Sequence, residues 1–240
     1  MSRAAALTAE EIARLTPDEQ RELYELQLTT LDARYRGDIH AWLEEQVWTI
    51  DEAGAEVLRF PTREEKPYIH ELIDYVDEYP RPVIPKSRRV LVSWAVAAYG
   101  VHRIRYFEAN AVYWQSLNVE KAAYIVGRRM AWIEDHLEDP ELRRPFRAHR
   151  VSSGDIGRME YLGTQSYAVG IPQGADAVRS FTGTILVMDE IDFQPEGREA
   201  LTAALPMVEK AAKLILITSS AGPRGVVAEI CREIGFVRFS

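Results

Sequence analysis

The sequence has a single cysteine, Cys231, so no disulfide can form within the chain. A lone cysteine indicates a reducing compartment, and neither a Cys₂His₂ nor a Cys₄ zinc site can be assembled from it. No apolar run approaches the ~20 residues that a membrane span needs, and the first residues lack the apolar segment of a signal peptide. None of the five histidines has the spacing of a metal ligand. We therefore expect a soluble, intracellular protein.

An excess of basic residues is also missing. The net charge of −8 over 240 residues excludes a basic DNA-coating protein. A nucleic-acid motor stays open, because only a local basic patch needs to touch phosphates. The basic run from Arg143 to Arg150 could be such a patch, or a solvated loop, or a subunit interface. With 47% hydrophobic and 28% charged residues, the composition is that of an ordinary globular protein.

The first part of the chain reads as helical. Residues 8–11 and 16–19 both fit a capping box, and the second has Pro17 at the first helical position. A further helix is expected over about residues 38–48, which carry two tryptophans. We interpret residues 1–60 as an N-terminal helical arm, which either packs on the rest or docks a partner, and residues 61–240 as a second unit.

From about residue 80, short apolar runs alternate with helical patterns, which indicates a mainly parallel sheet covered by helices. The expected strands are Pro82–Pro85, Asn110–Ser116, Met159–Leu162, Ser166–Ile171, Thr184–Met188 and Lys213–Thr218. The expected helices are Ser93–Tyr106, Val119–His136, Glu196–Glu209 and Arg224–Gly235. In such sheets, ligands bind at the carboxyl ends of the strands.

Two adjacent carboxylates end one of these strands. Asp189 and Glu190 follow the apolar residues Ile185 to Met188. A nucleotide site needs this arrangement, because the first acid can hold Mg²⁺, directly or through water, and the second can polarise the attacking water. An ordinary strand that ends in acidic turn residues is the other interpretation.

A basic strand–loop–helix lies about 100 residues upstream, at Pro85-Lys-Ser-Arg-Arg-Val-Leu-Val-Ser93. Phosphates bind the backbone N–H groups of a helix N-terminus in this setting. The usual glycine-rich loop is absent, since no glycine lies between Pro80 and Tyr99. A solvated basic turn therefore stays open as an alternative.

Two further signals are weak by themselves. The strand ending at Thr218 continues into Ser219 and Ser220, whose hydroxyls could bond a γ-phosphate or could belong to a polar turn. Arg179 lies on an expected loop just before the strand that delivers the acidic pair, where it could equally be a surface arginine.

Taken together, the order of these signals resembles the ATPase domain of the large terminase subunit of tailed double-stranded DNA phages, the motor that packages the genome. The resemblance extends over about residues 68–225 and not over the arm. Residues 85–93 look like the family's deviant Walker A loop, with the lysine moved to its start. The resemblance implies an α/β P-loop NTPase fold of the ASCE or RecA-like class, with ATP and Mg²⁺ as cofactors.

The resemblance also implies roles for the residues of the phosphate site. Lys86 would contact the β- and γ-phosphates, and Ser93 with Asp189 would bind Mg²⁺. Glu190, in the Walker B motif, would activate water. Further nucleotide contacts would come from the loop residues Ser87, Arg88 and Arg89. Leu91 departs from the family, which often has a glycine there.

Around this site, Arg179 would be an arginine finger that enters a neighbouring subunit's site, and Thr218 and Ser219 would couple hydrolysis to movement. The family's adenine-reading glutamine has no counterpart between Trp48 and Ser93. Tyr68 could stack on adenine instead, with His70 bonding it.

The implied function is ATP-driven translocation of double-stranded DNA into a procapsid, in the cytoplasm of an infected bacterium. The implied partners are the DNA, the portal protein, the small terminase subunit and further copies in a ring, with the isolated domain mainly monomeric and no membrane involved. The family's C-terminal nuclease domain is expected to be absent from this chain. A helicase-type translocase and a non-catalytic P-loop docking module are the alternatives.

Overall fold

A computed structural model describes residues 14–51, 56–86, 91–179, 183–209, 212–219, 225–230 and 237–239. Its α-helices are α2 (Pro17–Gly37), α3 (Ile39–Gln46), α4 (Pro67–Glu78), α5 (Val92–Tyr106), α6 (Val119–Ile125), α7 (Trp132–Asp135), α8 (Ala175–Arg179), α9 (Gly197–Glu209) and α10 (Val226–Ile230). Its strands are β1 (Trp48–Ile50), β2 (Val57–Arg59), β3 (Pro82–Lys86), β4 (Ala111–Gln115), β5 (Arg147–Arg150), β6 (Ile156–Tyr161), β7 (Ser166–Ile171), β8 (Ile185–Asp189), β9 (Lys213–Ser219) and β10 (Val237–Arg238).

One sheet organises the fold, with the strand order β10-β3-β9-β8-β4-β7-β6-β5. The strands from β10 to β7 pair in parallel, and β6 and β5 extend the sheet as antiparallel strands. The predicted α/β fold with a mainly parallel sheet is therefore confirmed. A separate hairpin pairs β1 with β2.

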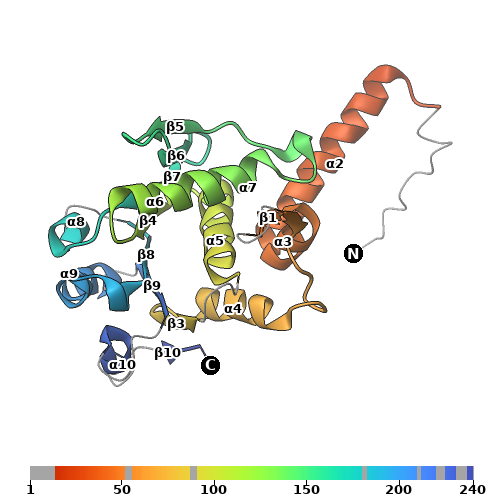
Figure 1. Cartoon of the computed structure of the whole chain (residues 1–240). Coiled ribbons are helices and arrows are strands. Elements are labelled where there is room, and N and C mark those ends of the chain that lie inside the picture. The colour runs from red at the N-terminus through yellow and green to blue at the C-terminus, as the bar shows by residue number, and fades with distance from the viewer. Residues whose placement is uncertain are drawn as a thin grey trace.

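Helices cover both faces of the sheet (Figure 1). One hydrophobic cluster joins α3, α4, α5 and α6 to one face, and a second joins α8, α9 and α10 to the other. Strands β4 and β8 are buried along their whole length, as expected for strands with a neighbour on each side and helices on both faces. The amino-terminal part of α2 projects from this body (Figure 1).

The predicted helical arm is present over the described residues. Thr16 caps α2 through a reciprocal capping box with Glu19, and Asp38 caps α3, which confirms the second predicted box. The first predicted box, residues 8–11, lies outside the described residues. Trp42 and Leu43 of α3 are fully buried in the cluster that contains α5, so the arm packs on the sheet's helices. The predicted boundary at residue 60 stays a prediction.

Several elements differ from the sequence-based expectation. The predicted helix Val119–His136 contains a π-helical segment, Val126–Ala131, between α6 and α7. The basic run ends in strand β5, and α4 precedes β3. The predicted helix Arg224–Gly235 is represented by α10; residue 225 lies before this helix, and residues 224 and 231–235 lie outside the described ranges.

A buried ion pair ties the helices together behind the sheet. Arg105 of α5 bonds Glu134 of α7, and the side chains of both are at most 1% exposed. The Tyr161 hydroxyl donates to Glu134 Oε2 at 2.5 Å, and Arg105 also donates to the Leu142 carbonyl. None of the helices in the described ranges is long and apolar enough to cross a membrane.

Candidate active site

Three parallel strands end side by side at the candidate site. Lys86, the last residue of β3, is in register with Ser219, the last residue of β9. Asp189 ends β8 and is in register with Ile217 of β9. The carboxyl ends of parallel strands share one edge of a sheet, so the predicted residues Lys86, Asp189, Glu190, Thr218 and Ser219 come together there.

The Lys86 ammonium lies at the centre of the cluster. Its Nζ donates to Ser93 Oγ at 2.9 Å and to Asp189 Oδ1 at 3.4 Å. It also lies 3.4 Å from Glu190 Oε1. One cation therefore links the start of α5 to both acids. Lys86 and Glu190 are 104 positions apart in the sequence, so only the fold brings them together.

Ser93 lies in the first turn of α5, where the helix N-terminus favours negative ligands. The residue before the helix, Leu91, has a φ of 40°, in the left-handed region that favours glycine. Glycine adopts this backbone readily, and Leu91 adopts it at a conformational cost. The predicted contacts Ser87, Arg88 and Arg89 lie outside the described residues.

Asp189 is the more buried acid, with 10% of its side chain exposed. Burial raises the pKa of the Asp189 carboxyl, and the neighbouring Glu190 carboxylate raises it further. The positive charges of Lys86 and Arg129 act in the opposite direction and lower this pKa, with Lys86 the stronger of the two. The Asp189 carboxyl therefore lies in a poorly solvated position beside the Lys86 ammonium.

Glu190 is oriented by the neighbouring strand. The Ser219 backbone N–H donates to Glu190 Oε2 at 2.9 Å, and the Ser219 hydroxyl donates to Oε1 at 3.3 Å. The backbone of Glu190 is left-handed, with a φ of 54°. A strained backbone of this kind is common at functional sites. With 37% of its side chain exposed, Glu190 is open to water, as a residue that activates water must be.

Thr218 is buried and lies beside the turn that follows Glu190. Its hydroxyl accepts from the Asp192 N–H at 3.3 Å and donates to the Ser219 carbonyl at 3.0 Å. Thr218 therefore joins the end of β9 to the turn that follows β8. The predicted coupling role of Thr218 and Ser219 stays a prediction.

Arg179 is not on a loop, as the sequence suggested, but ends the short helix α8. Its side chain is 64% exposed and pairs with Asp176 at 3.0 Å. No described contact joins Arg179 to Lys86, Asp189 or Glu190 of the same chain. This exposure fits a residue that acts on another molecule.

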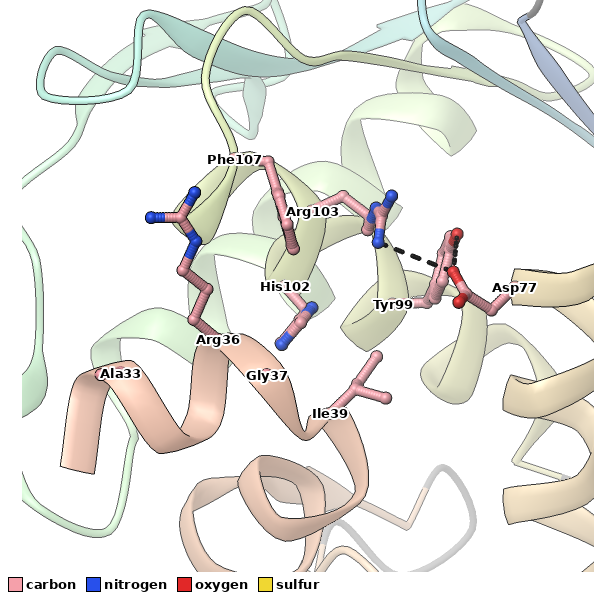
Figure 2. Close-up of a pocket in the computed structure, with 9 residues that line it drawn as sticks. All are labelled: Ala33, Arg36, Gly37, Ile39, Asp77, Tyr99, His102, Arg103 and Phe107. Atoms are coloured by element: carbon pink, nitrogen blue, oxygen red, sulfur yellow. Dashed lines mark hydrogen bonds and ion pairs between the residues drawn. The ribbon is translucent and has the colours of Figure 1, made fainter. Parts of the chain in front are cut away.

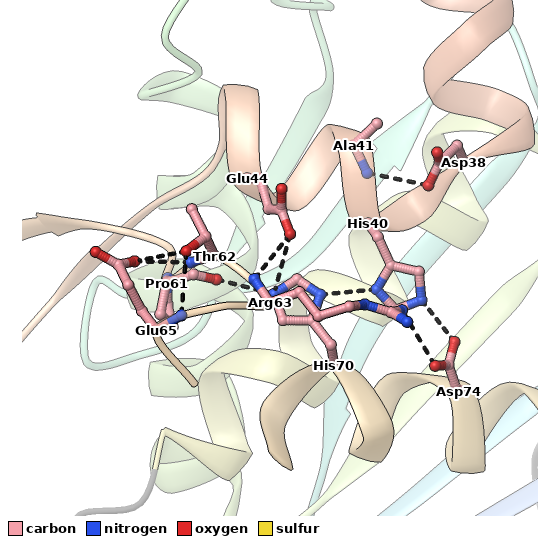
Figure 3. A network of polar contacts seen from close by, with 10 residues as sticks. All are labelled: Asp38, His40, Ala41, Glu44, Pro61, Thr62, Arg63, Glu65, His70 and Asp74. Atoms are coloured by element: carbon pink, nitrogen blue, oxygen red, sulfur yellow. Dashed lines mark hydrogen bonds and ion pairs between the residues drawn. The ribbon is translucent and has the colours of Figure 1, made fainter. Parts of the chain in front are cut away.

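The two residues suggested for adenine differ in access. His70 is fully buried: its Nε2 donates to the Pro61 carbonyl at 2.9 Å, and its Nδ1 lies 2.8 Å from His40 Nδ1 (Figure 3). The suggestion that His70 bonds adenine is wrong for this arrangement, because both ring nitrogens face protein atoms. Tyr68 is 39% exposed at the start of α4, and its role stays a prediction.

The sequence analysis missed two side chains next to the acids. The Gln194 amide donates to the Asp189 carbonyl at 2.9 Å. Arg129, on the π-helical segment, acts electrostatically on the Asp189 carboxyl, and its guanidinium lies 5.6 Å from the ring centre of Trp94. Neither belongs to a recognisable motif. For Arg129, the irregular helix is a signal, and it is visible only in the structure.

The side chains present fit a magnesium ion. Ser93 Oγ and Asp189 Oδ1 are hard oxygen ligands, and both lie near one ammonium. Within the described ranges, no group of three or more His, Cys, Asp or Glu is arranged to hold a metal. A magnesium ion here would need phosphate oxygens and water as its other ligands, which is how Mg²⁺ usually binds with nucleotides.

The chain is similar in structure to several phage large terminases. The large terminase of bacteriophage HK97 matches with a TM-score of 0.58 and 14% identity, over 85% of this chain and 43% of that one. The ATPase domain of the large terminase of Thermus phage P74-26 matches with a TM-score of 0.53 and 15% identity, over 68% of this chain and 75% of that domain. A large terminase from a thermophilic bacteriophage, in complex with ADP, matches with a TM-score of 0.52 and 11% identity, over 72% of this chain and 44% of that one.

These similarities confirm, at the level of the fold, the resemblance to large terminase ATPase domains. The chain spans less than half the length of the HK97 protein and of the ADP-bound protein. No family model and no curated protein matches the chain.

Proposed function

We propose that this chain is the ATPase motor domain of a terminase large subunit, which hydrolyses ATP to move double-stranded DNA into a procapsid. The observation that carries the proposal is the meeting of Lys86, Ser93, Asp189 and Glu190 at one edge of a parallel sheet. This set supplies a cation for phosphates, oxygen ligands for Mg²⁺ and a carboxylate for water. The ADP complex of a structurally similar terminase supports the nucleotide assignment.

Each side chain has one role in this proposal. When a nucleotide binds, Lys86 turns from the two acids to the β- and γ-phosphates. Ser93 and Asp189 would hold Mg²⁺, which would supply positive charge to neutralise the phosphates. Glu190, fixed by Ser219, orients the attacking water and accepts its proton. The loop residues Ser87, Arg88 and Arg89 add phosphate contacts, and Tyr68 stacks on the base.

Arg179 completes the site of a neighbouring copy. Its guanidinium is exposed and makes no described contact with its own site. An arginine supplied by a neighbour would stabilise charge on the transferred phosphoryl group. The working form is then a ring on the procapsid, in the infected bacterium's cytoplasm, and the separate chain is mainly monomeric and slow.

The DNA contact is assigned to the sheet's antiparallel edge. Strand β5 is exposed at every residue and carries Arg147, His149 and Arg150. The two arginines offset the net negative charge locally and could follow a phosphate backbone. The portal and the small terminase subunit are the proposed protein partners.

The test is nucleotide binding and turnover, with and without Mg²⁺, in wild type and Glu190→Gln. The variant keeps the side chain's shape, so ATP and Mg²⁺ should still bind, while turnover falls by about 10²–10⁴-fold. Glu108→Gln is the matched control, because Glu108 is an exposed acid between α5 and β4. Wild-type turnover in Glu190→Gln would remove Glu190 from the mechanism.

Two outcomes would favour the alternatives. Absence of nucleotide binding by the wild-type chain would favour a docking module. Turnover stimulated by single-stranded but not double-stranded DNA would favour a helicase-type translocase.

A further inference from the structure

Gln115 is a polar residue in an unusually buried position. It ends β4 and has no exposed surface. Its strand lies between β8 and β7, where Gln115 is in register with Met188 and Ile171. Alternation along the strand places its side chain on the same face as Tyr113, which packs in the cluster beneath α8 and α9.

The Gln115 amide ties down the connection that leads to Arg179. Its Nε2 lies 3.3 Å from the Pro172 carbonyl and 3.3 Å from the Gly174 carbonyl, so its two hydrogens serve two acceptors of one turn. That turn joins β7 directly to α8. Helix α8 is only five residues long, so its direction depends on how this turn is held.

The turn itself leaves little room for other conformations. Gly174 has a φ of +108°, which side chains rarely tolerate. A Cβ there would lie 3.0 Å from Glu196 Oε2, just before α9. In Figure 1, α8 and α9 lie on the same side of the sheet, and the two helices are in extensive contact. The turn is therefore held between the Gln115 amide and the start of α9.

Stability alone does not explain a glutamine here. Among the described residues, Gln115 Oε1 is buried and has no hydrogen-bond partner. A buried unsatisfied oxygen costs free energy, so an apolar residue of similar shape could be as stable or more so. What an apolar residue could not do is hold the two carbonyls of the Pro172–Gly174 turn.

We propose that Gln115 is the positioning residue for the arginine-bearing helix: its amide sets the Pro172–Gly174 turn so that α8 presents Arg179 to a neighbouring copy. The proposal rests on the function proposed above, in which Arg179 acts on the next subunit. It assigns Gln115 to the subunit that donates the arginine and not to the subunit whose nucleotide is hydrolysed, even though Gln115 lies one strand away from Asp189.

The test separates these two sides by mixing variants of the full chain. An Arg179→Ala chain keeps its acids but supplies no arginine, and a Glu190→Gln chain supplies the arginine but has no working site of its own. An equal mixture should recover turnover that neither chain shows alone. Gln115→Met is then added to one partner at a time, with Gln115→Leu as a second apolar variant.

We expect Gln115→Met in the Glu190→Gln partner to lower the recovered turnover by about tenfold or more, since a misplacement of about 1 Å can cost on the order of 10²-fold. In the Arg179→Ala partner, the same change should leave turnover within about twofold. Gln46→Met is the matched control, because it removes another buried glutamine, which bonds the Tyr35 hydroxyl in the arm. It should have no effect in either partner.

Hydrogen exchange supplies a readout that does not depend on turnover. Backbone exchange over residues 172–179 should rise in Gln115→Met, while exchange over β8 stays unchanged. Equal losses from both partners, or unchanged exchange in the turn, would overturn the assignment of Gln115. No recovery in the unmodified mixture would instead overturn the arginine supplied by a neighbour, and the role of Gln115 with it.

Discussion

Two regions of the molecule gather charged side chains, and they use them differently. At the edge of the sheet, the single ammonium of Lys86 lies 3.4 Å from both Asp189 and Glu190. Between α3 and α4, the charged side chains contact one another and nearby backbone atoms (Figure 3). His40 bonds Asp74 at 2.6 Å, and Arg63 pairs with the same carboxylate at 3.2 Å.

The second region is a closed network of polar contacts. The Pro61 carbonyl only accepts, so His70 Nε2 donates to it at 2.9 Å. The Nδ1 atoms of the two rings lie 2.8 Å apart, and His40 Nε2 contacts the Asp74 carboxylate. Both nitrogens of each ring therefore already have partners within the protein.

The groove between the arm and α5 leads to the same conclusion. It has a volume of about 470 Å³ and is lined by Arg36, Arg103, His102 and Phe107 among others (Figure 2). The Arg103 guanidinium lies 4.4 Å from the Phe107 ring centre and 3.6 Å from Asp77. The His102 ring bonds the Tyr35 carbonyl at 2.8 Å. These side chains therefore have partners within the protein, whereas at the sheet's edge the Lys86 ammonium faces two carboxylates.

Arg179→Ala should give the largest loss of activity. An arginine finger contributes about 10³–10⁵ in rate, and turnover per wild-type subunit should also rise with protein concentration as neighbours meet. Because the side chain is 64% exposed, the melting temperature should stay unchanged. Full activity of monomeric wild type at nanomolar concentration would contradict this role.

Glu134→Leu should instead act on stability. It leaves the buried Arg105 without its carboxylate, and breaking a buried ion pair typically costs about 3–5 kcal/mol. Chemical denaturation measures the loss. The double variant Glu134→Leu, Arg105→Met should recover much of it, and a double variant as unstable as the single one would show that the pair is not the cause.

Lys86→Ala should weaken the binding of ATP by about 10–100-fold, because hydrogen bonds to charged groups contribute about 1.5–3 kcal/mol. Adenosine, which has no phosphates, should bind as before. The pKa of Asp189 should rise further, since Lys86 opposes the effect of burial. Calorimetry with both ligands is the measurement, and equal losses for the two would exclude Lys86 as the phosphate contact.

The smallest expected effect is a pH dependence of the free energy of unfolding that comes from the buried histidine His102 of α5. Burial lowers the pKa of His102 to about 4, from an ordinary value of 6.5. The unfolded chain therefore binds the extra proton first, and stability is lost as the pH falls below 6.5, by about 2 kcal/mol at pH 5. Burial also lowers the pKa of His70, with the same sign.

Chemical denaturation at pH 8 and at pH 5 tests whether the protein is less stable at the lower pH. His102→Gln should reduce the difference between the two pH values, while His149→Gln, at an exposed position on β5, should not. An unchanged difference in His102→Gln would show that other groups carry the acid sensitivity.

Much of the sheet could be predicted because its strands are short apolar runs bounded by breaks. Ser166–Ile171 is observed as predicted, and β8 begins and ends one residue later than predicted. The exposed strand β5 was missed because RAHR has no apolar alternation. Helix α8 was missed because five residues carry too little periodicity.

The acidic pair, the shifted lysine and the serine that starts α5 were identifiable from the sequence, because each adjoins a strand or helix end that local pattern defines. Only the tertiary structure decided that Lys86 touches both acids, that Ser219 holds Glu190, that His70 is closed to ligands and that Gln115 holds the turn before Arg179. Local sequence determines where a strand ends, but strand order and register determine which ends meet. In the parallel part of the sheet, those depend on contacts between residues about 30 to 155 positions apart.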